Sequence, residues 1–203
     1  MSLFTQPYHD AVAQLTGPGA PFEVINCSIE GLSLKAFSQA HSSLSDYLNG
    51  GRQHGDKILL QYQGATWSFK DFFTAADRLS HWLVTEGNIT AGTPVAIAMR
   101  NRPEWLIAFV AIINVGGIAV PLNSWGKSAE LEQGLEDSHA ALLICDVPRW
   151  KYVQERKRIV PALIVDGDSS GPQQPDFHDV IRANWTGAIT PPAIDTQSPA
   201  ILL

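Results

Sequence analysis

The sequence predicts an α/β fold: a largely parallel sheet with helices on both faces, preceded by an N-terminal helix and hairpin region. Four short apolar runs recur roughly every 22 residues, with helical patterns between them, and this alternation is typical of a parallel sheet joined by right-handed crossovers. The runs show no polar alternation, which indicates strands buried on both faces. These runs are Val95–Met99, Ile118–Pro121, Ala141–Cys145 and Pro161–Val165.

The composition fits a globular chain and argues against nucleic acid as a partner. The 203 residues include 14 basic and 20 acidic side chains, for a net charge of −6, and the basic ones form no stripe. Charged residues make up 17% of the chain, below the roughly 25% usual for soluble domains, which suits a piece with faces covered by another lobe. The densest basic cluster, which spans Arg149 to Arg158, is interpreted as a solvated helix face in preference to a phosphate site.

The sequence shows no disulfide framework, leader peptide or membrane span. Cys27 and Cys145 lack metal-ligand spacing, and Cys145 ends an apolar run, which predicts a buried thiol. The N-terminus has no basic region followed by an apolar core. The longest apolar stretch, Trp105–Val120, is too short and too interrupted to cross a bilayer. We therefore expect a cytoplasmic protein.

The first 42 residues form an irregular segment in this interpretation, with room for one short helix around Pro7–Leu15 that ends at the Gly/Pro-rich stretch 17–21. A helix over Ser43–Leu48 opens the main domain, 43–166. Two alternating stretches, Ile58–Tyr62 and Ala65–Phe69, then flank a Gln-Gly turn and predict a β-hairpin.

A long helix follows the hairpin. Ser68 and Asp71 have the spacing of a capping box, and Gly87 supplies a stop. Apolar residues recur between them at helical spacing: Phe72, Ala76, Leu79 and Leu83.

Prolines and serines open the helices between the strands. Pro103 starts one that runs to about Val115 and presents Ile107, Val110 and Ala111 to the sheet, Ser128 caps the next, and Pro148 starts a third. Residues 167–203 are a connector, with one short helix from Asp176 to Asn184 and, at Ala200–Leu203, the start of a further strand.

Several segments together resemble the adenylate-forming (AMP-binding) superfamily, and the acyl-CoA synthetase branch, with its long-chain fatty acid–CoA ligases, most closely. One is ATWSFKDFFTAADRLSHWL, preceded by GDKILLQYQ, which is similar to the family's hairpin and helix. Another holds Asn-Arg-Pro-Glu-Trp (101–105), a glycine pair and Val-Pro-Leu-Asn (120–123). The last is SPAILL at 198–203, similar to the strand that leads to the family's phosphate-binding loop.

The resemblance implies that the chain is the N-terminal lobe of a synthetase, cut before that loop and acting as scaffold and one wall of the cleft. In the family, a carboxylic acid and Mg-ATP give an acyl-adenylate, from which the thiol of CoA displaces AMP. The phosphate loop, the ribose-binding Asp and the catalytic Lys of the family would lie beyond Leu203. The expectation is therefore no catalytic residue, metal site or bound cofactor in this chain, and inactivity alone.

Four residues follow predicted strands and are the candidates for the cleft. Arg100 and Asn101 come after the first strand, and Trp125 and Lys127 after the second, where ligands of open α/β sheets bind. The simpler interpretation is a helix-start loop for the first pair and packing against a missing lobe for Trp125, which otherwise lines an acyl or pantetheine path. The six histidines show no metal-binding or general-base pattern.

As partners, we expect the missing lobes of the chain's own synthetase, or a second copy of the chain that binds through faces that are interior in the full enzyme. Two alternatives to the acyl-CoA synthetase fragment stay open. One is a naturally short, non-catalytic interaction module, and the other is a fragment of an adenylation domain for amino or aryl acids.

Overall fold

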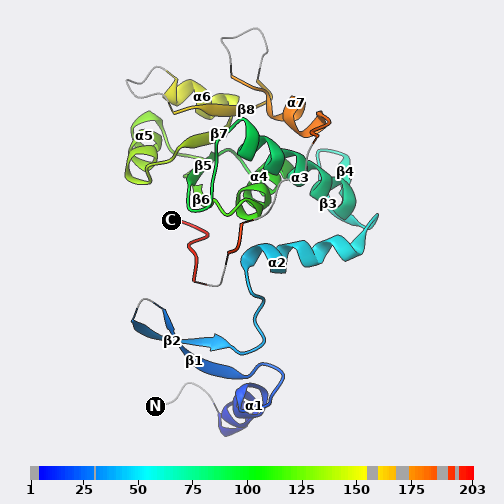
Figure 1. Ribbon diagram of the computed structural model, residues 1–203, viewed down its shortest axis with the longest axis vertical. Coiled ribbons are helices and arrows are strands. Elements are labelled where there is room, and N and C mark those ends of the chain that lie inside the picture. The colour runs from blue at the N-terminus through cyan, green and yellow to red at the C-terminus, as the bar shows by residue number, and fades with distance from the viewer. Residues whose placement is uncertain (1–4, 30, 155–159, 168–173, 187–191, 195–196) are drawn as a thin grey trace. The chain divides into compact units, whose positions relative to one another are not determined.

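The computed structural model describes residues 5–29, 31–154, 160–167, 174–186, 192–194 and 197–203. The chain divides into two compact units, Met1–Ser42 and Ser43–Leu203 (Figure 1).

The first unit is more regular than the sequence suggested. The expected helix is present as α1 (Gln6–Thr16), but an antiparallel hairpin of β1 (Val24–Ile29) and β2 (Leu32–Phe37) follows it. Gly31, at a φ of 82°, lies between the two strands. The prediction of an irregular segment is therefore wrong for this hairpin. The strands were not predicted because each is short and only half apolar. Their apolar residues nevertheless alternate and share one face.

The second unit begins with α2 (Leu44–Asn49) and a 3-10 turn, η1 (Gly50–His54). The predicted hairpin is confirmed as β3 (Ile58–Tyr62) and β4 (Ala65–Ser68). Gln63 and Gly64 have φ values of 48° and 82°. Two consecutive left-handed residues match the right-handed twist of a two-residue hairpin.

The predicted capping box starts the longest helix, α3 (Phe69–Thr85). The Ser68 hydroxyl accepts a hydrogen bond from the Asp71 amide at 3.0 Å, and the Asp71 carboxylate accepts one from the Ser68 amide at 3.4 Å. These bonds satisfy amide groups that have no partner within the helix.

Four parallel strands form the main sheet in the order β6-β5-β7-β8. The α/β prediction is confirmed, and each strand falls within one residue of its expected bounds. The strands are β5 (Pro94–Ala98), β6 (Ile118–Pro121), β7 (Leu142–Asp146) and β8 (Ala162–Val165).

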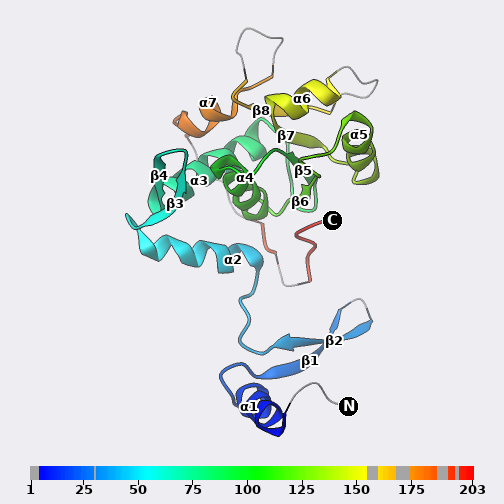
Figure 2. The ribbon, with the colours of Figure 1, turned by 180° about the vertical axis from the view of Figure 1, so that it is seen from behind.

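Helices cover both faces of this sheet (Figures 1 and 2). Alternate residues of β5 show this directly: Val95 and Ile97 pack into one core cluster with α3, α4 (Pro103–Asn114) and α7 (Phe177–Arg182). Ala96 and Ala98 pack into the other cluster, with α5 (Ser128–Asp137) and α6 (Val147–Val153).

Two details differ from the sequence-based expectation. Ser128 is the first residue of α5 and not its cap, because Lys127 occupies the cap position without a side-chain hydrogen bond. The stretch Ala200–Leu203 forms one bridge rather than a strand: Ile201 pairs in parallel with Ala119 of β6. Both views place the C-terminal segment beside β6 (Figures 1 and 2).

Candidate functional site at the carboxyl edge of the sheet

The strand order places a topological switch point at the carboxyl ends of β5 and β7. The chain runs from β5 to β6 on one side, then crosses back to β7 on the other. Loops that leave two such neighbouring strands diverge, and open α/β sheets bind ligands at this point. The side chains that follow β5, β6 and β7 therefore form the first candidate site.

An ion pair between Asp146 and Arg149 lies at this switch point, where β7 ends and α6 begins. The Asp146 carboxylate accepts from the Arg149 amide at 3.2 Å, which starts α6, and from Arg149 Nη1 at 3.2 and 3.1 Å. Both residues are buried, at 5% and 6% exposure. Arg149 Nε also donates to the Ser124 carbonyl at 2.9 Å, so the pair ties α6 to the loop after β6.

Arg100 and Trp125 lie together beside this ion pair. The Arg100 guanidinium carbon is 3.1 Å from the centre of the Trp125 ring, and the Arg100 amide donates to Asp146 at 3.3 Å. Nη1 of Arg100 is buried and has no hydrogen-bond partner among the described residues. Trp125 is 79% exposed. This pair presents a cation on an aromatic platform, which can bind an anion or stack against a planar group.

The other two candidates lie apart from this pair. Asn101 lines a separate cleft, described below, and Lys127 is an exposed side chain at the start of α5. The predicted basic face on α6 is wrong for Arg149, which is buried because its guanidinium pairs with Asp146, the N-cap residue of this helix. Lys151 is exposed, as expected, and Arg156–Arg158 lie outside the described residues.

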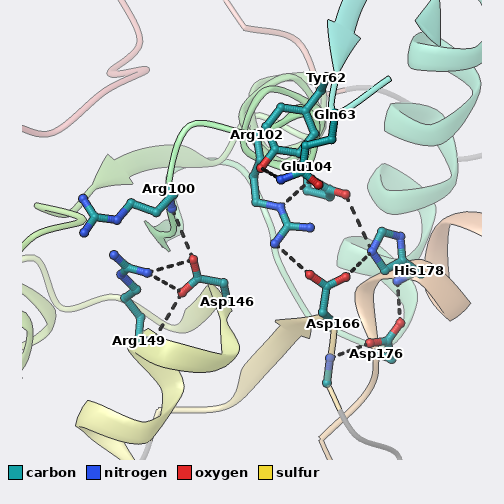
Figure 3. A network of polar contacts seen from close by, with 11 residues as sticks. Tyr62, Gln63, Arg100, Arg102, Glu104, Asp146, Arg149, Asp166, Asp176 and His178 are labelled. Atoms are coloured by element: carbon teal, nitrogen blue, oxygen red, sulfur yellow. Dashed lines mark hydrogen bonds and ion pairs between the residues drawn. The ribbon is translucent and has the colours of Figure 1, made fainter. Parts of the chain in front are cut away.

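A second network joins the start of α4, the residue after β8 and the start of α7 (Figure 3). Arg102 donates from Nε to Glu104 at 2.6 Å and from Nη1 to Asp166 at 2.9 Å. His178 Nε2 lies 3.0 Å from Asp166 and 3.6 Å from Glu104. Asp176 caps α7 by accepting from the His178 amide at 2.7 Å. The carboxyl ends of two strands are thereby held to one short helix.

The charges of this network support one another. Burial acts to lower the pKa of Arg102, but hydrogen bonds and attraction from Glu104 and Asp166 outweigh it and raise that pKa above its usual range. Burial likewise acts to raise the pKa of Asp166, but Arg102 and His178 outweigh it, and the net pKa lies below its usual range. Arg102 and Asp166 are therefore both charged near neutral pH.

A cleft of about 470 Å³ lies beside this network, between β3 and the start of α4. Its walls are mainly apolar and aromatic. The lining residues are Leu60, Gln61, Tyr62, Asn101, Arg102, Pro103, Trp105 and Leu106. The predicted cleft candidate Asn101 thus lines a cavity, whereas Arg100 and Trp125 are not among the residues that line it.

Sequence reasoning missed Asp146, Glu104, Asp166 and His178 as members of polar clusters. The only local signal was the spacing of Asp146 and Arg149 around Pro148, which is typical of a helix cap. The Arg102–Asp166 contact joins the start of α4 to the residue after β8, which is far away in sequence, so no local pattern reveals it.

The described residues also bear on metal binding, thiol chemistry and membrane insertion. Among these residues no group of three or more His, Cys, Asp or Glu could hold a metal ion. Burial, the largest cause, raises the pKa of the Cys145 thiol, which disfavours the reactive thiolate. Within the described ranges, no helix is long and apolar enough to cross a bilayer.

Comparison with known proteins gives a family match over most of the chain. The family model described as AMP-binding enzyme matches residues 49–203. A long-chain fatty acid–CoA ligase of Bacillus subtilis is 30% identical over 44% of this chain and 16% of its own length. Malpinin synthetase of Mortierella alpina is 29% identical over 57% of this chain and 2% of its own length.

Solved structures of low identity share the fold. Coronafacic acid ligase from Pectobacterium brasiliense superposes with a TM-score of 0.70 at 16% identity, over 78% of this chain and 33% of the other. The N-terminal subdomain of NpsA from Klebsiella oxytoca gives 0.65 at 18% identity, over 80% and 37%. The chain therefore spans only a minor part of each relative's length.

Proposed function

Because this chain belongs to the AMP-binding enzyme family, we propose that it forms the scaffold and one wall of the active-site cleft in an enzyme that activates a carboxylic acid with ATP. The family match over residues 49–203 is the observation that carries the proposal. The fold shared with the NpsA subdomain and coronafacic acid ligase supports it.

The proposed reaction has two steps. The carboxylate oxygen attacks the α-phosphorus of ATP, so that an acyl-adenylate forms and pyrophosphate leaves. The sulfur of CoA then attacks the acyl carbon and AMP leaves. Negative charge develops on phosphate oxygens in the first step, and Mg²⁺ supplies Lewis-acid stabilisation there when bound. No described residue cluster fits that metal, so none is assigned to it.

This chain's own contribution is positioning. The exposed ring of Trp125, held against the Arg100 guanidinium, suits the wall along which the acyl group or the pantetheine arm of CoA approaches. The Asp146–Arg149 pair holds that wall, because Arg149 bonds the Ser124 carbonyl next to Trp125. We propose that the 203-residue chain alone is inactive. The chains of coronafacic acid ligase and the NpsA subdomain are each more than twice as long, as the coverage of each pair of chains implies.

Two acid classes compete for the substrate. The Asn-Arg-Pro-Glu-Trp stretch at 101–105 and the 30% identity to a long-chain ligase favour a fatty or other simple carboxylic acid, passed to CoA. Relatives named malpinin synthetase and plipastatin synthase, and the NpsA complex with a 3-hydroxybenzoyl compound, favour an amino or aryl acid instead.

The test starts from the gene. We expect the reading frame to continue past codon 203, and the protein from that whole frame to catalyse ATP–pyrophosphate exchange with an acid. Panels of fatty, aryl and amino acids then decide the class. Fatty acids as the best substrates support the first option. A native stop at codon 204 would overturn the proposal and favour a non-catalytic interaction module.

A cytoplasmic location also remains a prediction, which cell fractionation tests.

A further inference from the structure

The walls of the cleft beside α4 are built mainly from apolar side chains of two elements. Leu60 and Tyr62 come from β3, and Trp105 and Leu106 from the first turn of α4. Trp105 is fixed by a stacked contact with Phe109, with ring centres 5.6 Å apart at 12°. A volume of about 470 Å³ falls within the roughly 300–1,000 Å³ of small-molecule sites.

Arg102 is the one charged residue that lines this cleft, and its charge is turned away from it. Its guanidinium points toward Glu104 and Asp166, which it meets at 2.6 and 2.9 Å (Figure 3). The aliphatic stem is then the part of Arg102 left to face the cleft, as long cationic side chains commonly arrange themselves. Two carboxylates already neutralise this cation, so it offers little attraction to an anionic ligand.

The polar groups that remain in the lining are uncharged. Gln61 and Asn101, both exposed, carry amides at the cleft. Amides donate and accept hydrogen bonds but supply no counter-ion. An ionised ligand group that packs among the apolar walls would lose part of its hydration without a charge partner, which is costly. The lining therefore discriminates against charge of either sign.

We propose that this cleft is a binding site for an uncharged hydrocarbon group, alkyl or aryl, that bears at most a neutral hydrogen-bonding end. The alkyl or aryl body packs between Tyr62 and Trp105, and the neutral end bonds an amide of Gln61 or Asn101. Glu104 and Asp166 act as positioning residues, because they keep the Arg102 charge out of the cleft. Arg100 and Trp125 do not line this cleft, and the proposal does not rest on the proposed function.

Titration of the labelled chain with matched small ligands tests this. The indole N–H signal of Trp105, assigned with a Trp105→Phe variant, reports occupancy by NMR. The probes are 1-octanol, naphthalen-2-ylmethanol, octanoate and octylammonium at equal ionic strength. We expect one or both alcohols to shift this signal saturably, and each ion to bind at least about tenfold more weakly, or 1.4 kcal/mol. The two alcohols distinguish chain-like from aryl ligands.

Two exposed helix residues supply a matched pair of variants. Leu106 in the cleft is 39% exposed, and Val84 on α3, outside the cleft lining, is 41% exposed. Leu106→Glu places a carboxylate at the site and should weaken alcohol binding at least about tenfold. Val84→Glu should leave it unchanged. Unaltered signals of the other indoles show that either variant is folded.

A third variant tests the role of the network. Asp166→Asn removes one carboxylate partner of Arg102, which should narrow the preference for alcohol over octanoate severalfold by freeing cationic charge. The proposal is overturned if octanoate binds as tightly as 1-octanol to the unaltered chain. It is also overturned if no probe shifts the Trp105 signal, or if Leu106→Glu and Val84→Glu bind alike.

Discussion

Arg149 is a buried cation that links the start of α6 to the loop after β6. Its guanidinium is only 8% exposed and its charge partner, Asp146, only 7%. Arg149→Met would leave Asp146 as an uncompensated buried carboxylate. We expect a loss of about 3–5 kcal/mol in the free energy of unfolding, measured by urea denaturation.

Lys151, on the same helix, provides the control for that variant. It is exposed, so Lys151→Met should change the unfolding free energy by less than about 0.5 kcal/mol. Equal midpoints for the two variants would show that the Asp146–Arg149 pair contributes nothing beyond an ordinary surface charge.

Asp166 gives the molecule a pH dependence of known sign. Its folded pKa lies below the usual value because Arg102 and His178 outweigh its burial. A lowered folded pKa stabilises the protein fully above the unfolded pKa of about 3.9, and that stability is lost as pH falls through the folded value. Asp166→Asn should therefore reduce stability near neutral pH and flatten the acid limb of the stability curve.

Chemical denaturation at a series of pH values between neutral and strongly acidic conditions measures this effect. A variant curve parallel to that of the unaltered chain over the whole range would contradict the proposed ion pairing.

For single residues, the sequence predicted the place in the fold better than the side-chain contacts. Arg100 and Trp125 could be placed at strand ends, because each follows an apolar run. The burial of Arg149 could not, because a basic residue in a basic stretch looks solvated until its neighbours are known. The Arg102–Asp166 bond depends on how β5 and β8 lie in one sheet, which is non-local information.

The helix α4 links its sequence pattern to the core of the sheet. Ile107, Val110 and Ala111 were expected to face inward and all three are buried. Ile107 has 0% exposure, so Ile107→Ala should cost about 2–5 kcal/mol through lost burial and a residual cavity. Its neighbour Leu106 is 39% exposed, and Leu106→Ala is the matched control with a much smaller cost.

Urea denaturation of both variants at unchanged slope decides this. A midpoint unmoved by Ile107→Ala would contradict the placement of that face of α4 against the sheet.

Elements of the main sheet were predictable because local signals agreed. Pro103 starts α4 at its first turn, Ser68 and Asp71 form the expected capping box, and uninterrupted apolar runs form the strands. The β1–β2 hairpin was missed although apolar and polar residues alternate along both strands, which is a strand signal that the sequence itself contains. Its face of alternating apolar side chains became clear only from the register, in which Cys27 pairs with Leu34.

That hairpin face bears on the state of the whole molecule. Its exposed members include Ile25, Leu32 and Leu34, at 43%, 66% and 46%. Apolar patches of this kind commonly mark interaction surfaces, and open strand edges add a second route to association. We therefore predict concentration-dependent self-association, measured by sedimentation velocity, and expect Leu32→Ser with Leu34→Ser to weaken it.

Val84→Ser is the control for these variants, since it removes an apolar side chain of similar exposure, 41%, from a helix. A monomer at every accessible concentration would contradict the predicted association.

We propose that these residues supply the wall and scaffold of an adenylate-forming site but not its catalytic groups. ATP–pyrophosphate exchange, measured on the 203-residue chain and on the protein encoded by its whole reading frame, is the direct test. We expect acid-dependent exchange by the whole protein and none above a no-protein blank by the chain alone. Exchange by the isolated chain, or its absence from the whole protein across fatty, aryl and amino acids, would contradict it.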